Sequence, residues 1–122
     1  MRLIALSLAK AAGWISRALG LGGGTTIPGM ILLKLRPRAL QEMAQELEEI
    51  IIISATNGKT TTARMVSHAA HESEISFVAN TSGANLSSGI ATALLQRNPD
   101  ERFGIFEIDE PALPDLIPQI RP

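Results

Sequence analysis

The chain has 122 residues, of which 45% are hydrophobic and 19% charged, with a formal net charge of −1. This length suffices for one small domain with an apolar core, and the composition excludes the disordered and fibrous classes of protein. The absence of cysteine excludes disulfide frameworks, thiolate zinc sites and cysteine nucleophiles within these residues.

Residues 1 to 45 are predicted to form a basic helical leader. Apolar residues recur at helical spacing from Leu3 to Leu19, which indicates an amphipathic helix. Four glycines within positions 20 to 24 end it, and we expect a flexible turn into Ile27-Pro28-Gly29. Residues 1 to 38 carry six basic side chains and no acid. Such a segment is typical of a solvated helix face, or of a surface that favours anionic lipid or an acidic partner.

The next two segments lead into a strand. Met30 to Leu35 fits either a short helix or a strand, whereas Arg38 to Glu49 predicts a helix because its apolar residues share one face. Ile50 to Ile53 is a run of β-branched residues without alternation. This pattern predicts a strand that is covered on both faces inside a parallel sheet.

Helices and strands then alternate to the end of the chain. We expect a helix from Lys59 to about Glu72, a strand over Ile75 to Ala79, and a helix that runs through Ile90 and stops before Asn98-Pro99. A third strand is expected over Phe103 to Ile108, and a last helix over Pro111 to Ile120, with proline in its first turn.

This alternation predicts an α/β fold. Residues 46 to 122 should form a P-loop-type open parallel sheet with flanking helices and right-handed crossovers, preceded by the helical leader of residues 1 to 45.

The segment from Ile50 to Thr62 has the order of strand, loop and helix that phosphate binding requires. Backbone N–H groups at a helix N-terminus point at an anion, and the helix dipole adds roughly half a positive charge there. Gly58 lets the chain approach phosphates without a Cβ, Lys59 adds a positive charge, and Thr60 is placed to offer its hydroxyl to Mg²⁺. The first glycine of the G-x-x-x-x-G-K-[ST] pattern is missing, because position 53 is isoleucine. A strand-to-helix turn that merely contains G-K-T is therefore the alternative.

Polar residues also follow the other two strands. Glu107 ends the third strand on the side where open α/β sheets bind ligands, and a carboxylate there can reach Mg²⁺. Asp109 and Glu110 lie beside it, so a solvated acidic strand end is the alternative. Asn80-Thr81-Ser82 follows the second strand, and we expect these residues to cap the next helix.

His68 and His71 have the i, i+3 spacing that two metal ligands on a helix require. No third ligand is evident in the sequence, so we interpret them as surface histidines.

The loop from Ser54 to Thr61 closely resembles the G-T-N-G-K-[ST]-[ST] loop of Mur ligases and folylpolyglutamate synthases, which are ATP-dependent acid–amine ligases. Ala55 stands where that family usually has glycine. Three further blocks occur in order, Gly22 to Gly29, Asn80 to Leu86 and Glu107 to Glu110. Together they look like the Mur-ligase-like subunit of lipid II isoglutaminyl synthase.

The resemblance implies ATP and Mg²⁺ as cofactors and assigns roles to matching positions. Lys59 and Glu107 are implied to be catalytic, and Thr60 and Glu107 to hold the metal. The residues implied to contact ATP are Ala55, Thr56, Asn57, Gly58, Lys59, Thr60, Thr61 and Asn85.

The resemblance also implies a reaction and its partners. The complete enzyme would phosphorylate the α-carboxyl of the D-glutamate in the lipid II stem peptide, and ammonia would then attack the acyl phosphate to give D-isoglutamine. The implied partners are a separate glutaminase subunit, GatD, which makes the ammonia, and lipid II at the cytoplasmic face of the membrane. We expect a cytoplasmic protein that can associate with the inner face of the membrane, and no nucleic acid.

The family's zinc-binding insertion, adenine-binding residues and C-terminal ligase domain have no counterpart in these 122 residues. We therefore expect an N-terminal part or a truncated gene, inactive as a ligase by itself. Two alternatives stay open: a non-catalytic NTP-binding, partner-docking or membrane-docking remnant, and another ligase of the Mur or folylpolyglutamate synthase type.

Overall fold

The computed structural model describes residues 4, 7, 8, 11, 14, 26 to 80 and 84 to 122. The expected leader helix and the glycine-rich turn after it lie almost entirely outside these residues. The described elements are α2 (Ile27–Leu35), α3 (Ala39–Ala44), β1 (Glu49–Ile53), α4 (Lys59–Glu72), β2 (Phe77–Ala79), α5 (Ser87–Gln96), β3 (Phe103–Glu107), a 3-10 turn η1 (Glu110–Ala112) and α6 (Leu113–Ile120).

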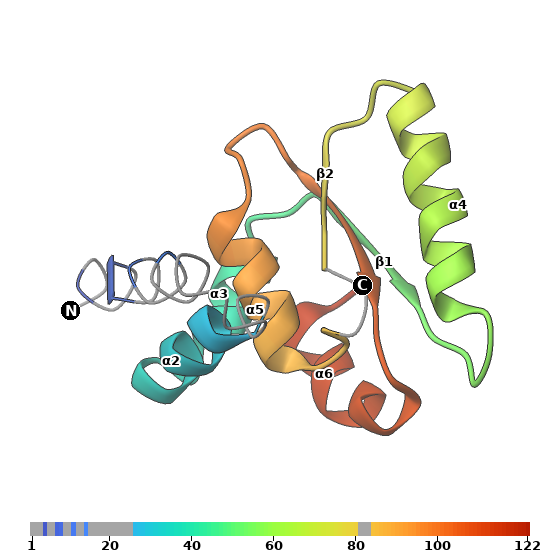
Figure 1. The fold of residues 1–122 in the computed structure, drawn as a ribbon. Coiled ribbons are helices and arrows are strands. Elements are labelled where there is room, and N and C mark those ends of the chain that lie inside the picture. Colours follow the sequence, from blue (N-terminus) through green and yellow to red (C-terminus); the bar gives the residue numbers. More distant parts are fainter. Residues whose placement is uncertain (1–3, 5–6, 9–10, 12–13, 15–25, 81–83) are drawn as a thin grey trace.

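The three strands form a parallel sheet in the order β1-β3-β2, so that the last strand in sequence lies in the middle. Ile53 lies opposite Glu107 in the pairing of β1 with β3, and Ala79 lies opposite Ile105 in the pairing of β2 with β3. The carboxyl ends of all three strands therefore meet at one edge of the sheet. The loop into α4 and the residues that follow β3 start from this edge (Figure 1). The expected α/β class with a small open parallel sheet and flanking helices is confirmed.

One face of the sheet carries the apolar core. Phe106 on β3 is fully buried there, and Ile50 and Val78 flank it on the outer strands. Helices α3, α5 and α6 cover this face, while α4 lies on the other side of the sheet (Figure 1). The buried residues that these three helices contribute are Leu40, Ala44, Ile90, Ala91, Leu94, Leu116 and Ile120.

The face beneath α4 is covered less completely. None of the residues of α4 is buried, and Ile51 on β1 is 46% exposed. The expectation that Ile50 to Ile53 is covered on both faces is therefore wrong for this part of the chain. The reason is that β1 is an edge strand of the described sheet and a single helix lies over that side.

Helix α2 begins at Ile27, directly after the segment in which the glycine-rich turn was expected, and continues through Leu35. Of the two options for Met30 to Leu35, the helix is therefore right. Proline suits the first turn of a helix because its missing N–H would have no partner there. Gly29 packs closely against α5: its N–H donates to Thr92 Oγ1 at 2.8 Å, and a Cβ would lie 1.9 Å from a backbone oxygen of α5. Glycine at this position therefore permits the close contact between the two helices.

The remaining boundaries lie close to those expected. Helix α3 ends at Ala44 and not near Glu49, because the N–H of Glu48 already donates to Arg102 O at 2.7 Å and draws the chain into the sheet. Strand β2 is shorter than expected, since the N–H of Ile75 donates to Ala70 O in the turn that closes α4. Helix α4 has its expected limits, and α5 ends before Asn98 as expected.

Candidate functional site

The loop between β1 and α4 ends at Gly58, whose φ of 83° is left-handed. A side chain would be strained in this conformation, although a Cβ here would meet no atom within 4 Å. Gly58 is the N-cap residue of α4, and no side chain caps this end of the helix. The first N–H groups of α4 therefore have no side-chain acceptor, and this is the arrangement that binds anions at helix N-termini.

Thr60 and Glu107 come together directly beside this helix end. The Thr60 hydroxyl donates to Glu107 Oε1 at 2.9 Å, and Asn85 Nδ2 donates to the same oxygen at 3.3 Å. Glu107 is only 5% exposed, and among the described residues no lysine, arginine or histidine forms an ion pair with it. Burying a carboxylate costs desolvation free energy, and neutral hydrogen-bond donors compensate only part of it. A nearby cation would offset the rest.

The two other acidic residues contact the loop and the start of α4. Lys59 Nζ lies 3.2 Å from Asp109 Oδ1, with the lysine side chain 19% exposed and the aspartate 44% exposed. The Thr56 hydroxyl lies 3.1 Å and 3.3 Å from the two carboxylate oxygens of Glu110. Asp109 and Glu110 thus interact with Lys59 and Thr56, two groups that a bound phosphate would also contact. An anion entering this site would compete with Asp109 for the amine of Lys59.

Two buried polar atoms in the site, Asn85 Oδ1 and Ser54 Oγ, have no hydrogen-bond partner within the described part of the chain. The Asn85 oxygen belongs to the same amide whose nitrogen contacts Glu107 Oε1 and, at 3.4 Å, Asp109 Oδ1. Hydroxyl, amide and carboxylate oxygens are the ligands that Mg²⁺ prefers. Over the described ranges, no group of three or more histidine, cysteine, aspartate or glutamate side chains is arranged to hold a metal ion. A Mg²⁺ ion at these donors would have to take its remaining ligands from phosphate and water.

A pocket of about 360 Å³ opens between α4 and the sheet, next to the contact of Thr60 with Glu107. It joins the polar end of the site to the less covered face of the sheet. Its lining comes from Thr60, Ala63, Arg64, Ser67, Ala79, Asn80, Ile105 and Glu107.

Asn80 does not have the capping role expected from the sequence. The N-cap residue of α5 is Leu86, and the side chain of Asn80 instead bonds the backbone of Glu107 and Ala84. Thr81 and Ser82, for which capping was also expected, lie outside the described residues. The signal in the sequence was an asparagine at the very end of a strand, but its partner on β3 depends on a strand order that the sequence does not reveal.

The structure thus brings four of the expected site residues into one network, since Lys59, Thr60, Asn85 and Glu107 are linked directly or through Asp109. The other expected residues lie in the loop or at the start of α4. Gly58 sits at the helix end, Thr56 contacts Glu110, Ala55 is half-buried, and Asn57 and Thr61 are exposed. Asp109 and Glu110 were noted only as neighbours of Glu107, and the structure pairs both with the loop and helix.

Ala55, the departure from the family's glycine, does not have a positive φ. Ala55→Gly is therefore expected to destabilise the protein by roughly 0.4 to 1 kcal/mol, because glycine adds conformational entropy to the unfolded chain. Denaturant titration of both proteins measures this difference. A more stable Ala55→Gly variant would show that alanine strains the loop.

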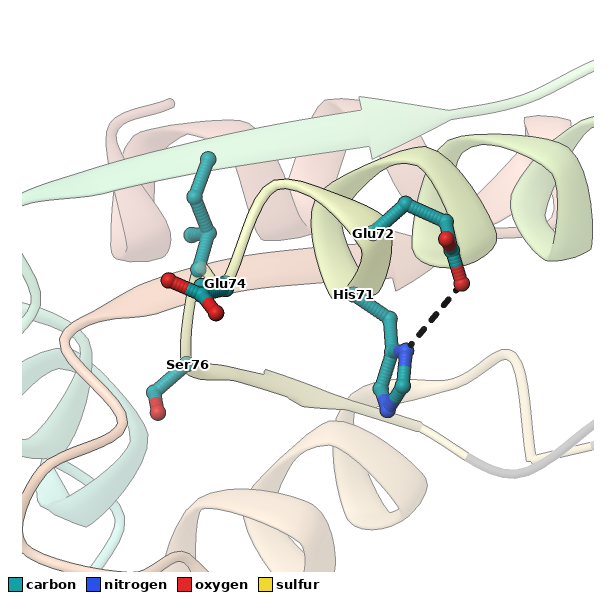
Figure 2. A pocket seen from close by; sticks show the side chains of 5 residues that line it. His71, Glu72, Glu74 and Ser76 are labelled. Carbon is teal, nitrogen blue, oxygen red and sulfur yellow. Dashed lines mark ion pairs between the residues drawn. The ribbon is translucent and has the colours of Figure 1, made fainter.

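The two histidines lie on the later turns of α4, away from Lys59. His71 Nδ1 lies 3.7 Å from Glu72 Oε1, and both side chains are exposed. His71 and Glu72 border a hollow of about 470 Å³ at the end of the helix (Figure 2), which Glu74, Ile75 and Ser76 complete. This hollow lies apart from the network around Glu107.

None of the helices among the described residues is both long and apolar enough to cross a membrane.

No protein-family model matches the chain. Curated relatives do match it: two proteins named lipid II isoglutaminyl synthase (glutamine-hydrolyzing) subunit MurT, from two strains of Staphylococcus aureus, are each 37% identical over 97% of this chain. The subunit of the same name from Streptococcus pneumoniae is 34% identical over 84% of it. The chain covers 27% of the length of the Staphylococcus proteins and 23% of the Streptococcus protein. By sequence, this chain is thus similar over most of its length to a part, about a quarter, of these MurT subunits.

Proposed function

We propose that this chain binds the phosphates of ATP together with Mg²⁺ at the N-terminal end of α4. The observation that carries the proposal is the contact of Thr60 with Glu107 at 2.9 Å, directly beside Lys59 and an uncapped helix end. A cationic side chain, free helix N–H groups, a hydroxyl and a buried carboxylate are the groups that P-loop sites use. The strand, loop and helix around them occur in the order β1, loop, α4, which is the order that phosphate binding requires.

Each residue would have a separate task. The N–H groups at the start of α4 and the amine of Lys59 would bind phosphate oxygens and neutralise their charge. Thr60 and Glu107 would hold Mg²⁺, with Asn85 close to them through its bond to Glu107. When bound, Mg²⁺ would neutralise negative charge that builds up on the transferred phosphoryl group. Lys59 would have to leave Asp109, so the aspartate would be released when phosphate enters.

We further propose that this chain is a part of an ATP-dependent carbon–nitrogen ligase of the MurT type. The relatives are named as subunits of a glutamine-hydrolyzing lipid II isoglutaminyl synthase. On this basis the substrate would be the D-glutamate carboxyl of lipid II, the product D-isoglutamine, and the ammonia would come from a GatD-like glutaminase subunit. This reaction would be a step of peptidoglycan synthesis, and it would take place in the cytoplasm at the inner face of the membrane.

Titration calorimetry of the 122-residue chain with ATP, ADP and AMP tests the phosphate site. We expect ATP binding that is strengthened by Mg²⁺, and little or no binding of AMP, because the described contacts are suited to the β- and γ-phosphates. Equal affinity for ATP and AMP would contradict the proposal, since the contacts would then be to the nucleoside.

A further inference from the structure

Asn80 directly follows β2, and its side chain forms two hydrogen bonds with β3. Both are with the backbone of the same residue, Glu107. Asn80 Oδ1 accepts from the backbone N–H of Glu107 at 2.9 Å, and Asn80 Nδ2 donates to the backbone oxygen of Glu107 at 2.8 Å. A side-chain amide presents a donor and an acceptor side by side, so it can satisfy the N–H and C=O of one residue together. Glu107 is the residue whose carboxylate accepts from Thr60.

This pairing occurs where the backbone ladder stops. The last paired residue of β2 is Ala79, which lies opposite Ile105, whereas β3 continues to Glu107. On the β2 side of β3, the amide of Asn80 therefore takes the place of a further backbone pair. Without it, the N–H and C=O of a buried residue would lose their partners, and the end of β3 would be held from the β1 side alone.

The same amide also holds the chain that carries Asn85. Asn80 Nδ2 donates to Ala84 O at 2.9 Å, and Ala84 directly precedes Asn85. Asn85 in turn donates to Glu107 Oε1, and its backbone oxygen accepts from the N–H of Asp109 at 3.3 Å. The side chain of Asn80 thus bonds both the backbone of Glu107, whose carboxylate accepts from Thr60, and the backbone next to Asn85.

We infer that Asn80 is a positioning residue, which sets the Mg²⁺ affinity of the site by fixing the backbone of Glu107. The inference rests on the proposed Mg²⁺–ATP site and adds a residue that touches neither ligand. Partners that orient metal ligands from behind typically change metal affinity by roughly 10- to 100-fold when they are removed. Asn80→Ala should therefore raise the Mg²⁺ concentration that gives half-maximal ATP binding by roughly tenfold or more.

The test is a double-mutant cycle on the 122-residue chain, with ATP as ligand and Mg²⁺ as the titrated ion. Wild type, Asn80→Ala, Glu107→Gln and the double variant are compared. Because Asn80 would act through Glu107, the double variant should need no more Mg²⁺ than Glu107→Gln alone. Thr92→Val serves as the control, since it removes one buried hydrogen bond between α2 and α5 and one within α5, and should lower the Tm without changing the Mg²⁺ requirement. If circular dichroism shows that Asn80→Ala is unfolded, Asn80→Ser takes its place in the cycle.

Each result separates the inference from the function on which it rests. A Mg²⁺ requirement unchanged by Asn80→Ala, while Glu107→Gln raises it, would overturn the positioning role and leave the proposed site intact. Effects that simply add in the double variant would also overturn it, because Asn80 would then act independently of Glu107. If the affinity of the wild type for ATP does not depend on Mg²⁺, the proposed metal site is overturned and this inference with it. The same holds if Glu107→Gln leaves the Mg²⁺ requirement unchanged.

Discussion

Lys59→Ala is expected to weaken ATP binding by more than tenfold, which corresponds to more than ~1.4 kcal/mol. Lys59 is the first residue of α4, so its charge adds to the helix N–H groups at the same place. Its side chain is largely buried, and its amine is 3.2 Å from Asp109, an interaction that phosphate can replace. Alanine would leave Asp109 without its ion-pair partner and the phosphate without the charge of the lysine.

Calorimetry with ATP at saturating Mg²⁺ measures this effect. Lys34→Ala is the matched control, because Lys34 is an exposed lysine in the last turn of α2. This variant should bind ATP with the affinity of the wild type. If Lys59→Ala and Lys34→Ala bind ATP with equal affinity, Lys59 does not contribute to the ATP site.

Glu107→Gln is expected to raise the Mg²⁺ requirement for ATP binding while the fold remains intact. Glutamine has the same shape and can still accept from Thr60, so the neighbouring contacts can persist. It lacks the negative charge that a divalent cation needs from its protein ligand. The effect should therefore appear in the Mg²⁺ titration and leave the circular dichroism spectrum unchanged.

Asp109→Asn is the informative comparison, because Asp109 carries the same charge beside the site but pairs with Lys59. We expect this variant to keep the wild-type Mg²⁺ requirement. The opposite result, a normal titration for Glu107→Gln and a raised requirement for Asp109→Asn, would move the metal role to Asp109.

Local signals in the sequence were sufficient for the loop and for α4. Gly58, Lys59 and Thr60 follow a run of four isoleucines, and strand, turn and helix form there as expected. Such features are local, because a turn that needs a left-handed residue and a helix that follows it are encoded within a few positions. The pairing of Thr60 with Glu107 was expected only through the metal they would share, and the structure brings the two side chains into direct contact.

Long-range features were harder to predict. The sequence does not say that β3 lies between β1 and β2, and this order places Asn80 beside Glu107 and leaves Ile51 at an edge. The sequence also gives no reason for glycine at position 29, because the close approach of α2 to α5 that requires it involves Thr92, 63 positions away. In each case the physical cause is a contact between distant segments.

Amide NMR spectra of the 122-residue chain, recorded during titration with ATP and Mg²⁺, test the proposed site most directly. We expect the largest shifts at Gly58, Lys59 and Thr60, where N–H groups would meet phosphate, with further shifts from Glu107 to Glu110 as the carboxylates change partners. Shifts confined to the hollow around His71, or no shifts at millimolar ATP, would contradict a phosphate site at the start of α4.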